Sequence, residues 1–110
     1  MKDIIEQLIK FRDERNWKQF HTPEHLAKSV VLEAAELLEN YQWEKNPDNL
    51  EDIKDEIADV MSYCLLLSEH YGFDVKEIIK DKIVKNEKKY RKDKAYGKFD
   101  KYTDLLWEHV

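Results

Sequence analysis

Two segments of the chain combine an apolar stripe with a pair of acidic residues at helical spacing. The first pair is Glu33 and Glu36 in LEAAELLENYQW, and the second pair is Glu56 and Asp59 in DIKDEIADVMSY. Because each pair is spaced i, i+3, its two carboxylates lie on one side of a helix, one turn apart. Both segments are therefore predicted to be amphipathic helices with an apolar stripe beside the acidic pair. The first stripe comprises Leu26, Ala27, Val30, Ala34, Leu37, Leu38 and Tyr41, and the second comprises Ile53, Ile57, Val60, Met61, Cys64, Leu67 and Tyr71.

The composition favours an all-α fold. The chain has 110 residues, two glycines, two prolines and 39% charged residues, which is typical of long amphipathic helices and argues against a β sandwich. We expect a single helical domain over residues 1–110. Residues 63–67 of the third helix are apolar on nearly every side, and a helix of that kind is covered all round. The predicted fold is an all-α four-helix bundle that is completed by oligomerisation.

Four carboxylates would converge if the two acidic helices packed antiparallel through their stripes. Residues 33 to 59 hold ten acidic side chains and only two basic ones, Lys45 and Lys54. Carboxylate oxygens select hard cations, Mg²⁺ first and Mn²⁺ as a substitute. A solvated charged edge is the ordinary explanation for one acidic pair, but two matched pairs favour a metal site.

An aromatic loop, NWKQFHTP, precedes the first acidic helix. Thr22 is a suitable N-cap and Pro23 a suitable first helical residue, so Trp17 and His21 lie just outside the helix start. The helix is predicted to run to Gln42 or Trp43. Two interpretations of the loop stay open: a hydrophobic staple with loop packing, or a platform on which a flat ring stacks.

The fourth helix carries polar residues on a face that begins apolar. Lys82, Asn86 and Tyr90 continue the face that starts at Val75. Polar residues on a core-facing stripe are the informative exceptions to burial. Residues 80 to 98 hold nine basic side chains and three acidic ones, and lysines beside an acidic metal site suit a substrate with several phosphates. Most of these lysines are expected simply to lie on a solvated surface. Lys82 and the nearby Asn86 are expected to bind substrate instead.

These features together predict a nucleotide hydrolase. Metal ions held by carboxylates promote substitution at phosphorus, the aromatic loop would hold a base, and the lysines would hold a polyphosphate. The net charge of −5 gives no general reason to expect nucleic-acid or membrane-surface binding. The first fifteen residues are charged throughout, unlike a signal peptide, so we expect a soluble, cytoplasmic protein. Cys64 lies on an apolar stripe and is expected in the core.

Four sequence blocks, in order, resemble the MazG-like superfamily of all-α nucleoside triphosphate pyrophosphohydrolases. They are WKQFHTP, LEAAELLENYQW, DEIADVMSYCLLL and the pattern K-x-x-x-N-x-x-x-Y that runs from Lys82 to Tyr90. The set is most similar to the dCTP pyrophosphatase branch and covers about residues 13–97, with residues 98–110 as a C-terminal tail. That branch often has an Arg-Asn pair where this chain has Glu24 and His25, which leaves the base preference open.

The resemblance implies a reaction, an assembly and roles for single residues. It implies a dimer or a dimer of dimers with sites near subunit boundaries, and hydrolysis between the α and β phosphates to a nucleoside monophosphate and pyrophosphate. Glu36 is our candidate for the proton acceptor because it lies farthest from the apolar stripe of its helix, and Glu56 is the second candidate catalytic carboxylate. The implied Mg²⁺ ligands are Glu33, Glu36, Glu56 and Asp59; the implied base-binding residues are Trp17, His21 and Trp43; and the implied sugar or phosphate contacts are Tyr63, Lys82 and Asn86.

Two other readings stay open. A di-iron carboxylate bundle would use Glu-x-x-His motifs on paired helices, and the sequence contains none. A non-catalytic helical interaction or regulatory module would use the acidic strips to bind a basic partner. That module would show no Mg²⁺-dependent turnover, and salt would weaken its binding strongly.

Overall fold

The computed structural model describes residues 1–90, and every regular element among them is helical. The predicted all-α class is therefore confirmed. The chain divides into two compact units, residues 1–75 and residues 76–110, and each is described by itself. The predicted tail over residues 98–110 lies outside the described residues. The elements are α1 (Lys2–Glu14), the 3₁₀ helix η1 (Lys18–Phe20), α2 (Pro23–Glu39), α3 (Leu50–Tyr71) and α4 (Val75–Lys89).

Local side-chain chemistry sets the ends of α2 and α3. Thr22 Oγ1 accepts a hydrogen bond from the backbone N–H of His25 (3.1 Å), and Pro23 follows as the first helical residue, as predicted. At its other end α2 stops at Glu39, short of the predicted end, because the Asn40 amide donates to the carbonyls of Glu36 (3.4 Å) and Leu37 (3.2 Å). The sequence also predicts that the third helix ends at Gly72, because glycine is the usual residue just after a helix. Gly72 does end α3, in the left-handed conformation (φ 72°).

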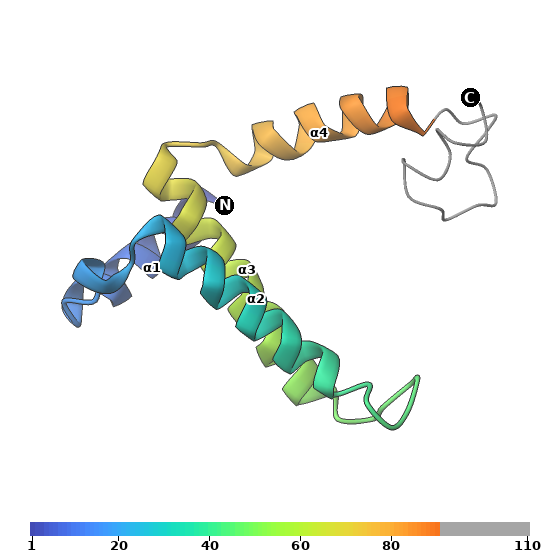
Figure 1. Cartoon of the computed structure of the whole chain (residues 1–110). Helices are drawn as coiled ribbons and strands as arrows, with labels where there is room; N and C mark the ends of the chain where they lie inside the picture. The colour runs from blue at the N-terminus through green and yellow to red at the C-terminus, as the bar shows by residue number, and fades with distance from the viewer. Residues whose placement is uncertain (91–110) are drawn as a thin grey trace. The chain divides into compact units, whose positions relative to one another are not determined.

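The helices α2 and α3 lie antiparallel and side by side (Figure 1). Their core is small: among the described residues the buried hydrophobic side chains are Leu26 (2% exposed), Leu65 and Leu66. Ser29 of α2 is buried on the same side as Leu26, and Glu33 and Glu56 are half-buried. Each helix has a polar strip beside its apolar stripe, made up of Ser29, Glu33, Glu36 and Asn40 on α2 and of Asp52, Glu56, Asp59 and Tyr63 on α3. The contact between the helices therefore includes part of each polar strip.

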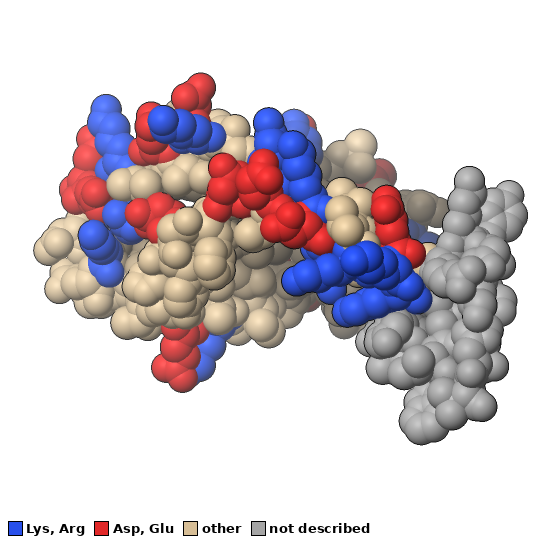
Figure 2. All heavy atoms as spheres, turned by 90° about the horizontal axis from the view of Figure 1, so that it is seen from above, with Lys and Arg blue, Asp and Glu red and all other residues tan. Residues whose placement is uncertain are grey.

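The predicted apolar stripes are only partly covered within the chain. Val30 and Leu37 are half-buried, but Leu38 is 69% exposed and Met61 is 51% exposed. The expectation that Cys64 lies in the core is wrong for this chain, because its side chain is exposed. The reason is rotation: each helix turns its polar strip toward its neighbour, so the far edge of each stripe faces outward. In the space-filling view, side chains without charge cover a broad continuous area of the visible face (Figure 2).

Helix α1 packs against α3 through one edge. The helical periodicity of the sequence predicts that Ile4, Ile5, Leu8 and Ile9 face the core. Ile5, Leu8 and Ile9 are half-buried, whereas Ile4 is 49% exposed. The one fully buried side chain of α1 is Arg12. None of the helices within residues 1–90 is long and apolar enough to cross a bilayer.

Truncating Leu26 should destabilise the fold more than the same change elsewhere on α2. Leu26→Ala removes a fully buried side chain and should lower the free energy of unfolding by about 2–4 kcal/mol. Leu32→Ala is the matched control, because Leu32 lies on the same helix and is 64% exposed. Urea denaturation followed by circular dichroism measures both, and equal losses would show that the α2–α3 contact is placed wrongly.

Candidate functional site

The carboxylates of the two acidic pairs meet between α2 and α3. Glu33 of α2 and Glu56 and Asp59 of α3 each offer an oxygen, and these three oxygens lie within 4.8 Å of one another. Glu36 lies close enough to the cluster for its charge to raise the pKa of Glu33 and of Glu56. The structure thus brings together all four carboxylates that the sequence singled out.

Burial and mutual repulsion destabilise the charged form of these carboxylates. Burial raises the pKa of Glu33, and the hydrogen bond and charge of Glu36 raise it further, followed by the charges of Asp59 and Glu56. Burial also raises the pKa of Glu56, with Glu36 and Asp59 as the next causes. Carboxylates this close together repel one another when all of them are charged. The cluster therefore requires a proton or a cation.

Two oxygen atoms in the cluster fit a metal ion. Glu33 Oε2 and Glu56 Oε2 are buried and have no hydrogen-bond partner among the described residues. A buried acceptor without a partner is costly, and a cation would satisfy both oxygens at once. Because the donor set consists of carboxylate oxygens alone, it suits a hard divalent ion and not a thiolate-preferring one.

Tyr63 links this carboxylate cluster to the aromatic loop. Its ring lies edge-on to that of His21, with ring centroids 6.4 Å apart and the planes at 69°. Burial raises the pKa of Tyr63, and the charges of Glu33 and Asp59 raise it further, so the hydroxyl remains a hydrogen-bond donor. Burial lowers the pKa of His21, as do the charges of Arg12 and His25, so its imidazole is held neutral.

A cavity of about 170 Å³ joins the aromatic loop to the acidic cluster. It includes three residues that the sequence assigned to nucleotide binding, Trp17, His21 and Tyr63, and it reaches Asp59 of the carboxylate cluster. The remaining lining residues are Leu8, Phe11, Arg12, Ser62 and Leu66. Flat hydrophobic walls with a few polar groups are typical of sites that bind a ring.

Three predicted substrate-binding residues are not part of this cavity. Trp43 lies in the loop after α2 and is 87% exposed. The 17 residues of α2 span about 25 Å and separate it from the aromatic loop. Lys82 and Asn86 lie on α4 in the second unit, where Lys82 is exposed and Asn86 half-buried. A hydrogen bond with Lys89 and the charges of Lys89 and Lys85 lower the pKa of Lys82.

Sequence reasoning missed Arg12 and Phe11, which line the cavity from α1. A signal for Arg12 was present: it follows Ile5 by seven residues and Leu8 by four, so it continues the apolar stripe of α1 as a charged residue. The same kind of signal singled out Lys82 and Asn86. No comparable signal exists for Phe11, which is 48% exposed and lies beside the stripe.

The fold and the site define an all-α protein with a carboxylate centre between two antiparallel helices and a ring-sized cavity beside it. The model of the MazG-like family matches residues 28–105. The chain belongs to the MazG-like family, and the resemblance inferred from the four sequence blocks is confirmed.

Named relatives are similar over nearly the whole chain. The chain is 30% identical to mouse dCTP pyrophosphatase 1 over 114 residues, an alignment that covers 96% of this chain and 67% of the mouse protein. It is 29% identical to the human protein of the same name, with the same coverage. A crystal structure of a pyrophosphatase from Archaeoglobus fulgidus is similar with a TM-score of 0.77 and 38% identity, over 83% of this chain and 92% of that one.

Divalent metal ions should raise the melting temperature, and the increase should shrink at mildly acidic pH. The raised pKa values of Glu33 and Glu56 mean that, without metal, their contribution to stability is present below the unfolded-state pKa and is lost as pH rises through the folded-state values. Protons and metal ions therefore compete for the same oxygens. Thermal unfolding with Mg²⁺, with Mn²⁺ and with EDTA, across mildly acidic to mildly alkaline pH, measures the increase.

Glu56→Gln should abolish most of this metal-dependent increase. Glu51→Gln is the control, because Glu51 lies on the same helix with its side chain 85% exposed and paired with Lys54. If metal ions stabilised wild type and Glu56→Gln equally, the ions would bind elsewhere.

Proposed function

We propose that the chain hydrolyses nucleoside triphosphates between the α and β phosphates, releasing a nucleoside monophosphate and pyrophosphate, with Mg²⁺ as the metal and Mn²⁺ as a substitute. The chain is a nucleotide pyrophosphohydrolase, as its family and named relatives indicate. One observation carries the mechanism: Glu33 and Glu56 each keep a buried oxygen that has no partner within residues 1–90. These oxygens lie within a cluster of four acids, and none of the ion pairs found in that part of the chain joins a basic residue to this cluster.

The carboxylate cluster would hold the metal through Glu33, Glu36, Glu56 and Asp59. When bound there, Mg²⁺ would neutralise phosphate oxygens and make a water molecule more acidic. The protein's own contribution is to take up the proton. Glu56 and Glu36 are our candidates, because burial and the charge of Glu36 raise the pKa of Glu56, and Glu36 is exposed to solvent.

The distance between the cavity and the acids suits a nucleoside phosphate. Asp59 and Tyr63 are one helical turn apart on α3, which is about 6 Å along the axis. A base between Trp17 and His21 would therefore have its sugar beside Tyr63 and its first phosphate at the acids. The protonated hydroxyl of Tyr63 would donate to the sugar or to a phosphate oxygen.

The basic face of α4 would bind the rest of the polyphosphate. Lys82 and Asn86 are spaced i, i+4 and share one face of the helix. Lys82 is close enough to Lys85 and Lys89 for their charges to lower its pKa. Like charges gathered on one face are relieved by a polyanion, and lysine is a common phosphate ligand.

The proposed substrate preference is dCTP or a modified pyrimidine nucleotide, in a role that removes unwanted nucleotides from the cellular pool. The mouse and human relatives carry the name dCTP pyrophosphatase 1. In this chain the His25 ring lies nearly parallel to that of His21, with ring centroids 6.3 Å apart and the planes at 16°. His25, whose ring lies beside that of the cavity residue His21, would therefore adjust the choice of base, together with its neighbour in the sequence, Glu24.

The proposed working form is a cytoplasmic homodimer or homotetramer, with residues 1–110 as one domain. The outward edges of the two apolar stripes support association. By helical spacing, Ala34 and Leu38 of α2 and Ile57 and Met61 of α3 lie on the same side of the antiparallel pair, opposite the acids. All four side chains are exposed in the single chain, and monomeric proteins rarely expose a continuous apolar face of this kind. A second copy would cover it.

Association would also explain the position of Trp43. Within one chain this residue lies at the opposite end of α2 from His21, so it would contact a bound base only in the site of a second copy. Such an arrangement makes each site a product of two subunits.

Product analysis tests the reaction. A panel of deoxy- and ribonucleoside triphosphates, incubated with Mg²⁺ or with EDTA, should give monophosphate and pyrophosphate with metal only. Glu56→Gln should lose at least about 100-fold in kcat with its helical content unchanged, while Glu51→Gln stays near wild type. Orthophosphate and diphosphate would place the cleavage at the wrong bond. No product from any nucleotide would favour the helical interaction module instead.

Mixing two defective variants tests whether Trp43 acts in a neighbouring subunit. Trp43→Ala should raise KM, and Glu56→Gln should remove turnover. If subunits exchange in a twofold dimer, an equal mixture should recover about a quarter of the wild-type sites at low substrate concentration, because half the dimers are mixed and each of these has one intact site. Activity equal to the average of the separate variants would mean that Trp43 acts within its own chain or not at all.

A further inference from the structure

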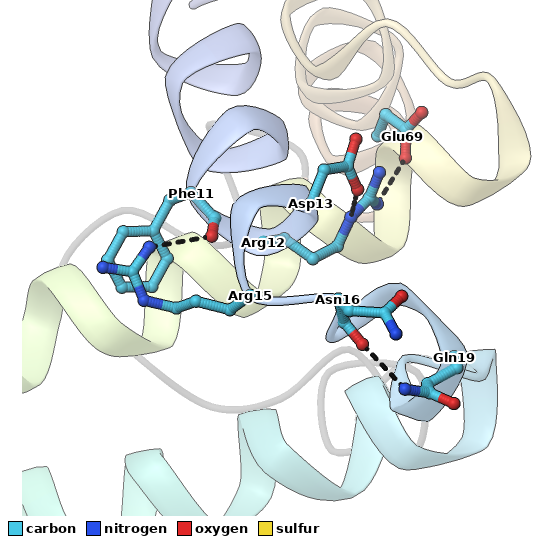
Figure 3. A network of polar contacts seen from close by, with 7 residues as sticks. All are labelled: Phe11, Arg12, Asp13, Arg15, Asn16, Gln19 and Glu69. Carbon is cyan, nitrogen blue, oxygen red and sulfur yellow. Dashed lines mark hydrogen bonds and ion pairs between the residues drawn. The ribbon is translucent and has the colours of Figure 1, made fainter.

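Arg12 is a buried charge at the junction of α1, the aromatic loop and α3. It is 6% exposed, and its Nε atom lies 2.9 Å from Asp13 Oδ1. One terminal guanidinium nitrogen lies 3.5 Å from Glu69 Oε2 on α3 (Figure 3). The hydrogen bond from Arg12 is the largest cause that lowers the pKa of Asp13. A buried guanidinium is tolerated only with such partners, so Arg12 fastens α1 to α3.

The backbone of Arg12 holds the start of the aromatic loop. Its carbonyl oxygen accepts hydrogen bonds from the N–H groups of Arg15 (3.2 Å) and Trp17 (3.1 Å). Between them Asn16 has a left-handed backbone (φ 54°), a conformation that asparagine tolerates better than most residues. The chain therefore makes a turn after α1 that is closed on the carbonyl oxygen of Arg12. One residue thus fixes Trp17 through its main chain and α3 through its side chain.

Arg12 also separates two hollows in the same unit. Arg12, His21 and Leu66 line both the cavity that reaches Asp59 and a neighbouring one of about 250 Å³ that includes Glu69. His21 Nδ1 is buried without a partner among the described residues. The charge of Arg12 is, after burial, the next cause that lowers the pKa of His21. The charge of Arg12 thus adds to burial in favouring the neutral form of the His21 imidazole, which lies in the wall that both hollows share.

We propose that Arg12 is a positioning residue that holds the Trp17–His21 loop against α3, so that the ring cavity is open to the base of a nucleotide. Arg12 contacts the loop and α3 but is not one of the four carboxylate-site residues, so it acts on binding of the ring and not on the chemical step. The inference rests on the proposed function for the identity of the ligand, because a base is the ring that this function brings to the cavity.

Kinetics of Arg12→Gln test the proposal. KM for the best nucleoside triphosphate should rise about tenfold or more, while kcat at saturation stays within about threefold. Binding of inorganic tripolyphosphate with Mg²⁺, measured by calorimetry, should be unchanged because it has no ring. Arg12→Lys should be intermediate, since an ammonium keeps the charge but lacks the planar fork that meets two carboxylates.

Two further variants provide controls. Lys10→Gln removes a positive charge from an exposed position of α1 and should leave both KM and kcat near wild type. Glu69→Gln should raise KM in the same direction as Arg12→Gln, and the double variant should be no worse than Arg12→Gln alone. Equal weakening of nucleotide and tripolyphosphate by Arg12→Gln would reduce Arg12 to a general stabiliser of the fold. An unchanged KM would also overturn the proposal.

A measurement without nucleotide separates this inference from the proposed function. In a background of Trp43→Phe and Trp107→Phe, Trp17 is the single tryptophan, and its quenching by acrylamide reports the placement of the loop. Arg12→Gln should increase quenching and Lys10→Gln should not. Increased quenching in a protein that cleaves no nucleotide would support the placement role and refute the ligand. Unchanged quenching would refute the placement itself.

Discussion

Repulsion among the carboxylates that meet between α2 and α3 is the constraint on which the structure depends. Glu33 and Glu56 approach each other across the helix contact, and each leaves an oxygen atom without a hydrogen-bond partner among the described residues. The hydrophobic core around them is too small to offset this repulsion easily, since its buried side chains among the described residues are Leu26, Leu65 and Leu66. A ligand that neutralises the acids therefore also stabilises the packing of α2 against α3.

Periodicity predicted the helices and the acidic pairs well, because both follow from spacing along one helix. The ends marked by Thr22 and Gly72 were also predictable, since each has a local cause. The rotation of α2 about its own axis could not be predicted. The apolar stripe from Leu26 to Leu38 is wide enough to fit several rotations, which differ in whether Glu33 or Leu38 faces α3. The sequence predicted both apolar stripes as core-facing, whereas the structure leaves eight of their fourteen residues exposed.

The aromatic loop shows a second limit of sequence reasoning. Trp17 and His21 were predicted to lie near a ring site, and both line the same cavity. Arg12 was missed because α1 carries many charged residues and such residues are usually solvated, and because its partner Glu69 is 57 positions away along the chain. Trp43 is the opposite case. The resemblance to the family predicted that it contacts the base of a nucleotide, but in a single chain its side chain is exposed to solvent. Both cases depend on contacts between distant segments.

The rigid helices between the ring cavity and the acids have a consequence for how the chain length can vary. Thr22 caps α2 beside His21, and the same uninterrupted helix carries Glu33. One inserted or deleted residue between them would turn the carboxylate by about 100° and shift it by about 1.5 Å relative to the cavity. The same holds between Glu56 and Tyr63 on α3. Insertions and deletions are therefore compatible with the site only in the loop over residues 40–49 and toward the chain ends, whereas substitutions are not restricted in this way.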